Sequence, residues 1–263
     1  MSAGLFSLVA GLAGIAGFGA GFIGLGGGVL LFPLLLYLPP YFGLEPIDAK
    51  TAAALIVSEV FFAGVIGGAA HWRKGRVQTK LTLVGAVLSA VGAFVGGTAS
   101  IWVSEGFLVA LFGIITLVAG LVMFLPAPSA EEEAATLDSV IIRAVPLGAI
   151  SVSVGIVVGL LGAGNFLFVP LLVYVLKIPT RITIGSSLII HALNGFAGFA
   201  GKLITGQIPF LMTIAVIIGA SVGALFGEKS HSRVSPQTLR YAYCIVIGLV
   251  AVRVWITILG FDR

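Results

Sequence analysis

The sequence predicts an all-α integral membrane protein on three grounds: its composition, its long apolar runs and its abundant glycine. Hydrophobic residues make up 59% of the 263 residues and charged residues only 9%, and the mean hydropathy is +1.19. A soluble domain carries about 25% charged residues, so this chain has too few charges to cover a surface exposed to water. The 37 glycines suit the close packing of membrane helices.

Eight apolar runs follow one another along the chain. They cover residues 4–38, 49–70, 79–103, 106–125, 140–176, 182–204, 209–227 and 237–260. A polar stretch with two prolines and three successive glutamates separates the fourth run from the fifth, and we interpret it as an exposed linker. The prediction is therefore a first repeat at 1–125, an acidic linker at 126–139 and a second repeat at 140–263. Since the first basic residue is Lys50, we expect no cleavable signal peptide.

The first and the fifth runs are too long for single membrane helices. Each holds about 35 residues, whereas about 20 residues cross the bilayer. Both contain helix breakers near the middle, namely Gly24 to Gly28 before Pro33, and Gly159 to Asn165 before Pro170. We therefore predict that each run is a re-entrant or hairpin pair of short helices joined at a glycine break, followed by three ordinary transmembrane helices.

The two broken runs also resemble each other, which predicts an internal duplication. Gly21 to Gly26 parallels Gly159 to Gly164, and a shift of one residue aligns the downstream prolines. The further matches are Tyr37 with Tyr174, Gly64 and Gly67 with Gly195 and Gly198, and Gly75–Val77 with Gly206–Ile208. Each half of the chain then has one broken run and three ordinary runs.

The distribution of Lys and Arg favours an inverted orientation of the two repeats. If both broken runs start and end on one side of the membrane, ten of the 14 basic residues face one side and four the other. If each broken run crosses once, the division is eight to six. Because basic residues collect on the cytoplasmic side, we expect inverted repeats with both termini outside. Parallel repeats, with glycines that serve packing alone, are the alternative.

The glycine breaks are the first candidate binding site. A broken helix presents free backbone N–H groups and a positive dipole end, which together attract an anion without a charged side chain. The candidate substrate-binding residues in the breaks are Gly24, Gly26, Gly27, Gly28, Gly162, Gly164 and Asn165. Close helix packing is the other explanation for these glycines.

Polar residues inside the apolar runs extend this candidate site. Ser186 and Ser187 lie in the run 182–204, and steps of four and three place Ser187, His191 and Asn194 on one helix face. Glu59 is the only acidic residue well inside an apolar run. Burying a lone carboxylate there costs several kcal/mol of free energy unless the group is protonated, paired or exposed to water. We interpret Glu59 and His191 as candidates for coupling to a proton gradient, against the alternative of satisfied interhelical hydrogen bonds.

Two further polar residues are expected at the membrane surfaces. Lys202 lies near the end of its run, where it either helps to attract an anion or extends to the interface, and we favour the interface. His71 is expected to face water beside the basic residues that follow it.

Several classes of function find no support in the sequence. Enzyme signatures such as His-Glu-x-x-His or a Gly-Lys-Ser/Thr loop are missing, so we expect neither an enzyme nor catalytic residues. The single Cys244 excludes a cysteine metal cluster, and no metal or cofactor is expected. Because the basic residues lie in loops, the net charge of +4 sets membrane orientation and does not indicate nucleic acid. The oligomeric state stays open.

These motifs together resemble the TauE/SafE family of sulfite and organosulfonate exporters. The resemblance rests on Gly21–Gly28 with Pro33, on its repetition from Gly159 to Pro170, and on Ile184–Leu188, and it spans essentially the whole chain. It implies a multi-pass protein of the bacterial cytoplasmic (inner) membrane that moves sulfite, sulfoacetate or a related sulfonate. Asn165 stands where a further glycine is expected, and its amide could contact the substrate.

The sequence and the resemblance together predict a secondary transporter that exports a small sulfur-containing anion by alternating access. Protons or another ion would couple the transport to a gradient across the lipid bilayer. A passive anion channel is the main alternative, and an intramembrane enzyme or a membrane scaffold is the third.

Overall fold

The computed structural model describes residues 2–23, 26–75, 77–122, 144–231 and 236–259, and these residues form helices and short connections without a strand. The first half contains α1 (Ala3–Ile23), α2 (Gly28–Tyr37), the 3₁₀ helix η1 (Pro39–Phe42), α3 (Ala49–Arg73), α4 (Thr79–Ala99), the 3₁₀ helix η2 (Ser100–Trp102) and α5 (Glu105–Val122). The second half contains α7 (Ala144–Leu161), the 3₁₀ helix η3 (Asn165–Leu167), α8 (Phe168–Pro170), the π-helix η4 (Leu171–Val175), α9 (Thr180–Ile204), α10 (Phe210–His231) and α11 (Pro236–Ile258). The all-α prediction is confirmed. The predicted acidic linker lies outside the described residues.

Among the described residues, six helices are long and apolar enough to cross a membrane. These candidate spans are Ala3–Phe22, Ala49–Arg73, Thr79–Trp102, Glu105–Val122, Ile182–Ile204 and Phe210–Ser230. Four shorter apolar helices accompany them, at Gly28–Tyr37, Val145–Leu161, Asn165–Val175 and Cys244–Ile258. The chain is therefore a multi-pass membrane protein.

Glycine interrupts both long apolar runs. In the first half α1 ends at Ile23 and α2 begins at Gly28, and Gly26 between them has a φ of 64°. In the second half α7 ends at Leu161, and Gly162 has a φ of 72°. Since this left-handed conformation is readily open only to glycine, these two residues allow the chain to turn where each helix stops.

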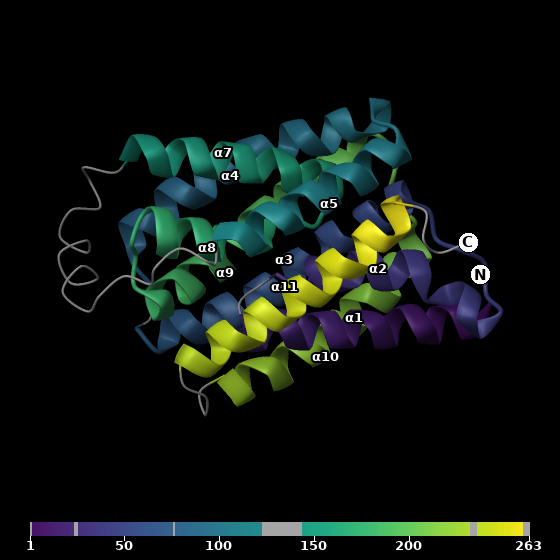
Figure 1. Ribbon diagram of the computed structural model, residues 1–263, viewed down its shortest axis with the longest axis horizontal. Helices are drawn as coiled ribbons and strands as arrows, with labels where there is room; N and C mark the ends of the chain where they lie inside the picture. The colour runs from purple at the N-terminus through teal and green to yellow at the C-terminus, as the bar shows by residue number, and fades with distance from the viewer. Residues whose placement is uncertain (1, 24–25, 76, 123–143, 232–235, 260–263) are drawn as a thin grey trace.

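Each broken run folds back on itself. Gly4 near the start of α1 lies beside Leu44, which follows α2. In the second half Leu171 of η4 lines one surface groove together with Ala149 and Ile150 from the first turns of α7. Figure 1 shows α1 beginning and α11 ending at one end of the bundle, which we call the terminal end. We call the opposite end, where α5 ends and α7 begins, the linker end.

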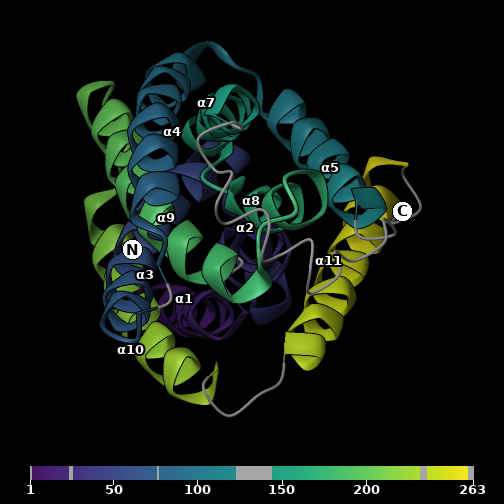
Figure 2. The same cartoon turned by 90° about the vertical axis from the view of Figure 1, so that its left-hand side faces the viewer.

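Helices from the two halves pack against each other along much of their lengths. α1 lies along α10, α4 lies along α7, and α3 crosses beside α9, as Figures 1 and 2 show from two directions. Glycines let these backbones touch: a methyl group added at Gly219 would overlap the Ala10 carbonyl, and one added at Gly155 would overlap the Ser89 carbonyl. Small residues at such interfaces are typical of membrane helices.

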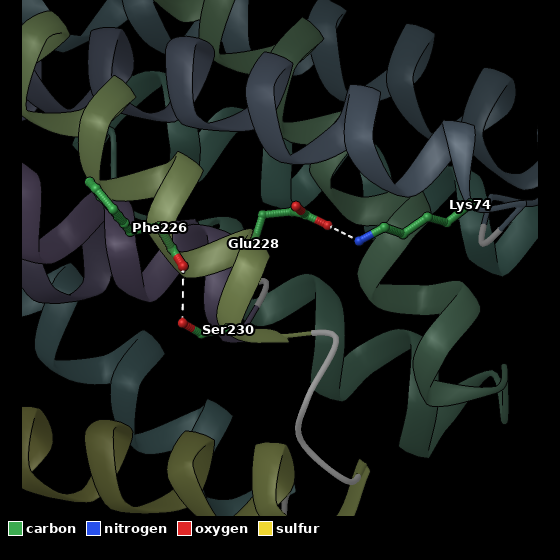
Figure 3. Close-up of polar contacts among 4 residues, drawn as sticks. All are labelled: Lys74, Phe226, Glu228 and Ser230. Carbon is green, nitrogen blue, oxygen red and sulfur yellow. Dashed lines mark hydrogen bonds and ion pairs between the residues drawn. The ribbon is translucent and has the colours of Figure 1, made fainter.

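An ion pair joins α3 and α10 at the linker end. Lys74, the residue that follows α3, donates a hydrogen bond to the carboxylate of Glu228 on α10 (Figure 3). On the same helix the Ser230 hydroxyl donates to the Phe226 carbonyl at 3.0 Å. A partly exposed ion pair contributes about 0–1 kcal/mol to stability, so the pair marks the contact of α3 with α10 and is not what holds it together.

Candidate functional site

The two glycine breaks meet inside the bundle. A methyl group added at Gly26 would lie 2.9 Å from Cβ of Asn165, and one added at Gly28 would lie 3.0 Å from Cα of Ala163. The first break of the chain therefore contacts the second, although the two are about 140 residues apart in the sequence. Any side chain at Gly26 would intrude between them.

A pair of buried asparagines lies at this junction. The amide of Asn194 on α9 donates to the Asn165 side-chain oxygen at 2.7 Å and to the Ser89 hydroxyl of α4 at 2.9 Å. In return the Asn165 amide donates to the Asn194 oxygen at 3.2 Å. These hydrogen bonds connect the second break to α9 and α4, and they place two amide groups within an apolar interior.

Glu59 and His191 flank the first break from α3 and α9. The Glu59 carboxylate lies against the backbone of Gly27, and the His191 ring lies against Gly26 and against the backbone of Asn165. Neither carboxylate oxygen and neither ring nitrogen has a hydrogen-bond partner of ordinary geometry among the described residues. Buried polar groups are normally paired, so these two side chains are exceptions that the packing of the site does not explain.

Two helix N-termini also open toward the junction. α2 begins at Gly28 and the second short helical segment begins at Asn165, and neither N-cap glycine, Gly27 or Gly164, supplies a side-chain cap. The first N–H groups of a helix have no acceptor within the helix, and the dipole is positive at this end. Backbone donors and amide groups together can solvate a small anion.

The site is closed on all sides. The exposed fractions of Glu59, His191 and Asn194 are 0%, and that of Asn165 is 1%. A small ion would therefore reach these groups only if helices moved apart.

The structure brings most, but not all, of the predicted site residues together. The residues that gather at the junction are Gly26, Gly27, Gly28, Asn165, His191, Asn194 and Glu59. Gly162 packs against the Ala53 carbonyl and Ile56, and Gly164 packs against the end of α7. Both glycines therefore allow close packing of the second break against neighbouring helices. Gly24 lies outside the described residues.

Ser186 and Ser187 make their hydrogen bonds away from the junction. The Ser186 hydroxyl accepts from the backbone N–H of Gln78 at the start of α4, at 3.1 Å, and the Ser187 hydroxyl donates to the Ile184 carbonyl at 3.0 Å. Their role as substrate ligands stays a prediction.

Sequence reasoning missed Ser89 at the site and Ser151 on α7. Ser89 completes the asparagine pair, while the buried Ser151 hydroxyl has no hydrogen-bond partner among the described residues. A lone serine in an apolar helix usually bonds its own backbone, so composition alone could not single them out.

Two expectations about surface residues are wrong. Lys202 does not extend to the membrane interface, and His71 does not face water, since the exposed fraction of each is 0%. The Lys202 ammonium donates to the Ser100 hydroxyl at 2.7 Å and to the Leu160 carbonyl at 3.3 Å. The Lys202 side chain therefore binds acceptors inside the bundle and does not extend outward to the interface.

Comparison with known proteins gives a consistent result over nearly the whole chain. The family described as "Sulfite exporter TauE/SafE" matches residues 9–254. A "Probable membrane transporter protein" of Xylella fastidiosa strain 9a5c is 28% identical over 253 residues, which is 95% of this chain and 93% of the relative. The "Probable membrane transporter protein YdhB" of Bacillus subtilis is 28% identical over 230 residues, 84% of this chain and 89% of the relative.

A more distant relative matches over a similar share of the chain. The "Probable membrane transporter protein MJ0441" of Methanocaldococcus jannaschii is 23% identical over 250 residues, 90% of each chain. No solved structure matches the chain significantly. Because the family match covers almost the full length and includes both glycine breaks, the chain belongs to the TauE/SafE family of membrane transporters.

Proposed function

We propose that this chain is a secondary transporter that exports a small sulfur-containing anion, sulfite, sulfoacetate or a related sulfonate, across the bacterial cytoplasmic membrane. The observation that carries the proposal is the junction of the two breaks, where two helix N-termini meet buried amides and a buried histidine. Oxyanions take hydrogen bonds from such donors, and positive helix ends offset their charge. The family description supports the sulfur-containing class.

Alternating access would follow from a duplicated and inverted architecture. The hairpin of the first half packs along α10 of the second half, and the hairpin of the second half packs along α4 of the first. α3 and α9, which would hold equivalent positions in two such repeats, pack against each other. The first hairpin begins at the terminal end and the second at the linker end (Figure 1), as inverted repeats at 1–125 and 140–263 would require.

In this proposal each group at the junction has a distinct role. Backbone N–H groups at Gly26, Gly27 and Gly28 and around Asn165 bind the anion, and the Asn165 and Asn194 amides orient it. His191 lies against Gly26 and donates a further hydrogen bond when it carries a proton on the nitrogen that faces the anion. Ser186, Ser187 and Gly24 would contact the anion in a state with another arrangement of the breaks.

Glu59 is expected to couple transport to protons. The Glu59→Gln variant keeps the size of the side chain but cannot exchange a proton. It should therefore lose accumulation of anion driven by a pH gradient in proteoliposomes, by about tenfold or more, while it retains exchange of anion for anion. Glu45→Gln, on an exposed segment before α3, is the control and should behave like the wild type. Undiminished proton-driven accumulation in Glu59→Gln would remove Glu59 from the coupling mechanism.

Binding to the purified protein tests the substrate class. The panel is sulfite, sulfoacetate, taurine, sulfate and acetate, and the measurement is the shift of the thermal midpoint, since a ligand of the folded state raises apparent stability. We expect sulfite or a sulfonate anion to stabilise the protein more than acetate does. A channel would also bind anions, so the passive-channel alternative needs the flux measurement described in the Discussion.

A further inference from the structure

A second polar cluster lies near the terminal end, apart from the junction of the breaks. Its centre is Lys202 on α9, which is fully buried two residues before the helix ends at Ile204. The ammonium donates to the Ser100 hydroxyl at 2.7 Å, to the Leu160 carbonyl at 3.3 Å and to the Gln207 side-chain oxygen at 3.5 Å. These three partners are uncharged.

Lys202 is therefore a buried cation whose recorded partners among the described residues carry no negative charge. Burying a charge without an opposite charge costs several kcal/mol, and ionisable residues inside a membrane protein usually face the pathway of a substrate or an ion. An anion beside Lys202 would relieve this cost.

The position of Lys202 connects this cluster to the junction. Steps of four, three and four residues along α9 lead from His191 through Gly195 and Gly198 to Lys202, so the four lie on one helix face. The Leu160 carbonyl belongs to the last turn of α7, two residues before the second break at Gly162. Lys202 thus lies on the terminal side of the same break that contributes Asn165 to the junction.

We propose that Lys202 is a second anion-binding site, which the transported oxyanion occupies between the junction and the terminal end. This proposal rests on the proposed function, because the ligand is the same anion. On arrival the anion accepts a hydrogen bond from the ammonium in place of the Leu160 carbonyl or the Ser100 hydroxyl. That exchange frees the ends of α7 and α4 from α9, so occupancy of the site favours opening toward the terminal end.

The test compares two substitutions that alter the cluster in different ways. Lys202→Gln removes the charge and keeps a hydrogen-bond donor, whereas Ser100→Ala removes an acceptor and keeps the charge. The apparent KM for sulfite and sulfoacetate is measured in right-side-out and inside-out membrane vesicles. Thermal midpoints without anion show that each variant is folded.

A charged donor to an anion contributes enough that its loss weakens binding by about tenfold or more. We therefore expect Lys202→Gln to raise the apparent KM by about that factor when the anion is added on the membrane side of the terminal end. The apparent KM on the other side should stay within about twofold of the wild-type value. Ser100→Ala should lower the KM at the terminal face, because the ammonium is then freer to bind the anion, and should leave the other face within about twofold.

Either of two results would overturn the inference. One is an unchanged KM at the terminal face in Lys202→Gln. The other is an equal rise in Ser100→Ala, which would show that Lys202 only clamps the helix ends. If Lys202→Gln does not fold, a rise of the terminal-face KM in Ser100→Ala by itself overturns the inference. Failure of the proposed function has a different signature, because the wild-type vesicles would then transport neither sulfite nor sulfoacetate.

Discussion

Gly26→Ala is expected to fold and to lose almost all anion transport. The added methyl group would lie 2.9 Å from Cβ of Asn165 and 3.3 Å from Nδ1 of His191, so it would enter the space where the two breaks meet. It also places alanine at a φ of 64°, which costs about 1–2 kcal/mol. The measurement is uptake of labelled sulfite or sulfoacetate into proteoliposomes with equal amounts of inserted protein.

The chain offers a matched control for the strain at Gly26. Gly43 has a φ of 66° and no neighbour within 4 Å of an added methyl group, so Gly43→Ala introduces the same strain without the intrusion. Gly162 and Gly206 form a second such pair, each with a φ of 72°, and only Gly162 is closely packed. Equal loss of transport in Gly26→Ala and Gly43→Ala would mean that strain alone explains the effect and that the junction does not bind the anion.

Asn194→Leu should lose both stability and transport, and a double variant separates the two effects. The single substitution leaves the Asn165 amide and the Ser89 hydroxyl without their buried partner, which costs about 1–3 kcal/mol for each group. In Asn165→Leu/Asn194→Leu both members of the pair are apolar, so the thermal midpoint should recover in part. Transport should stay absent, since the amides that orient the anion are gone.

The outcome that would contradict this role is recovery of transport together with stability in the double variant. The asparagines would then be structural, and the backbone donors at the breaks would have to bind the anion without them.

The sequence alone was sufficient to predict the helices and the positions of their glycine breaks. Composition and run length predict the membrane helices, and Gly26 and Gly162 lie at the breaks because only glycine readily turns the chain there. Glu59 and His191 stood out because a lone ionisable side chain in an apolar run is rare.

The contacts between the halves were beyond the reach of the sequence. The pairing of Asn165 with Asn194 and Ser89 joins three helices, and nothing in the local sequence of α4 distinguishes Ser89 from a serine that bonds its own helix. The interior position of Lys202 was predicted wrongly for the same reason. Its acceptors, Ser100 and Leu160, come from segments 102 and 42 residues away, so only the packed bundle shows that the side chain turns inward.

Counterflow is the measurement that tests the central claim, an anion carrier that works by alternating access, most directly. Proteoliposomes with the purified protein are loaded with unlabelled sulfite or sulfoacetate and diluted into a trace of the labelled anion. We predict a transient accumulation of label above its equilibrium level, which saturates with anion concentration and disappears in Gly26→Ala. Flux that never exceeds equilibrium and rises linearly with concentration would contradict the carrier and favour a passive channel.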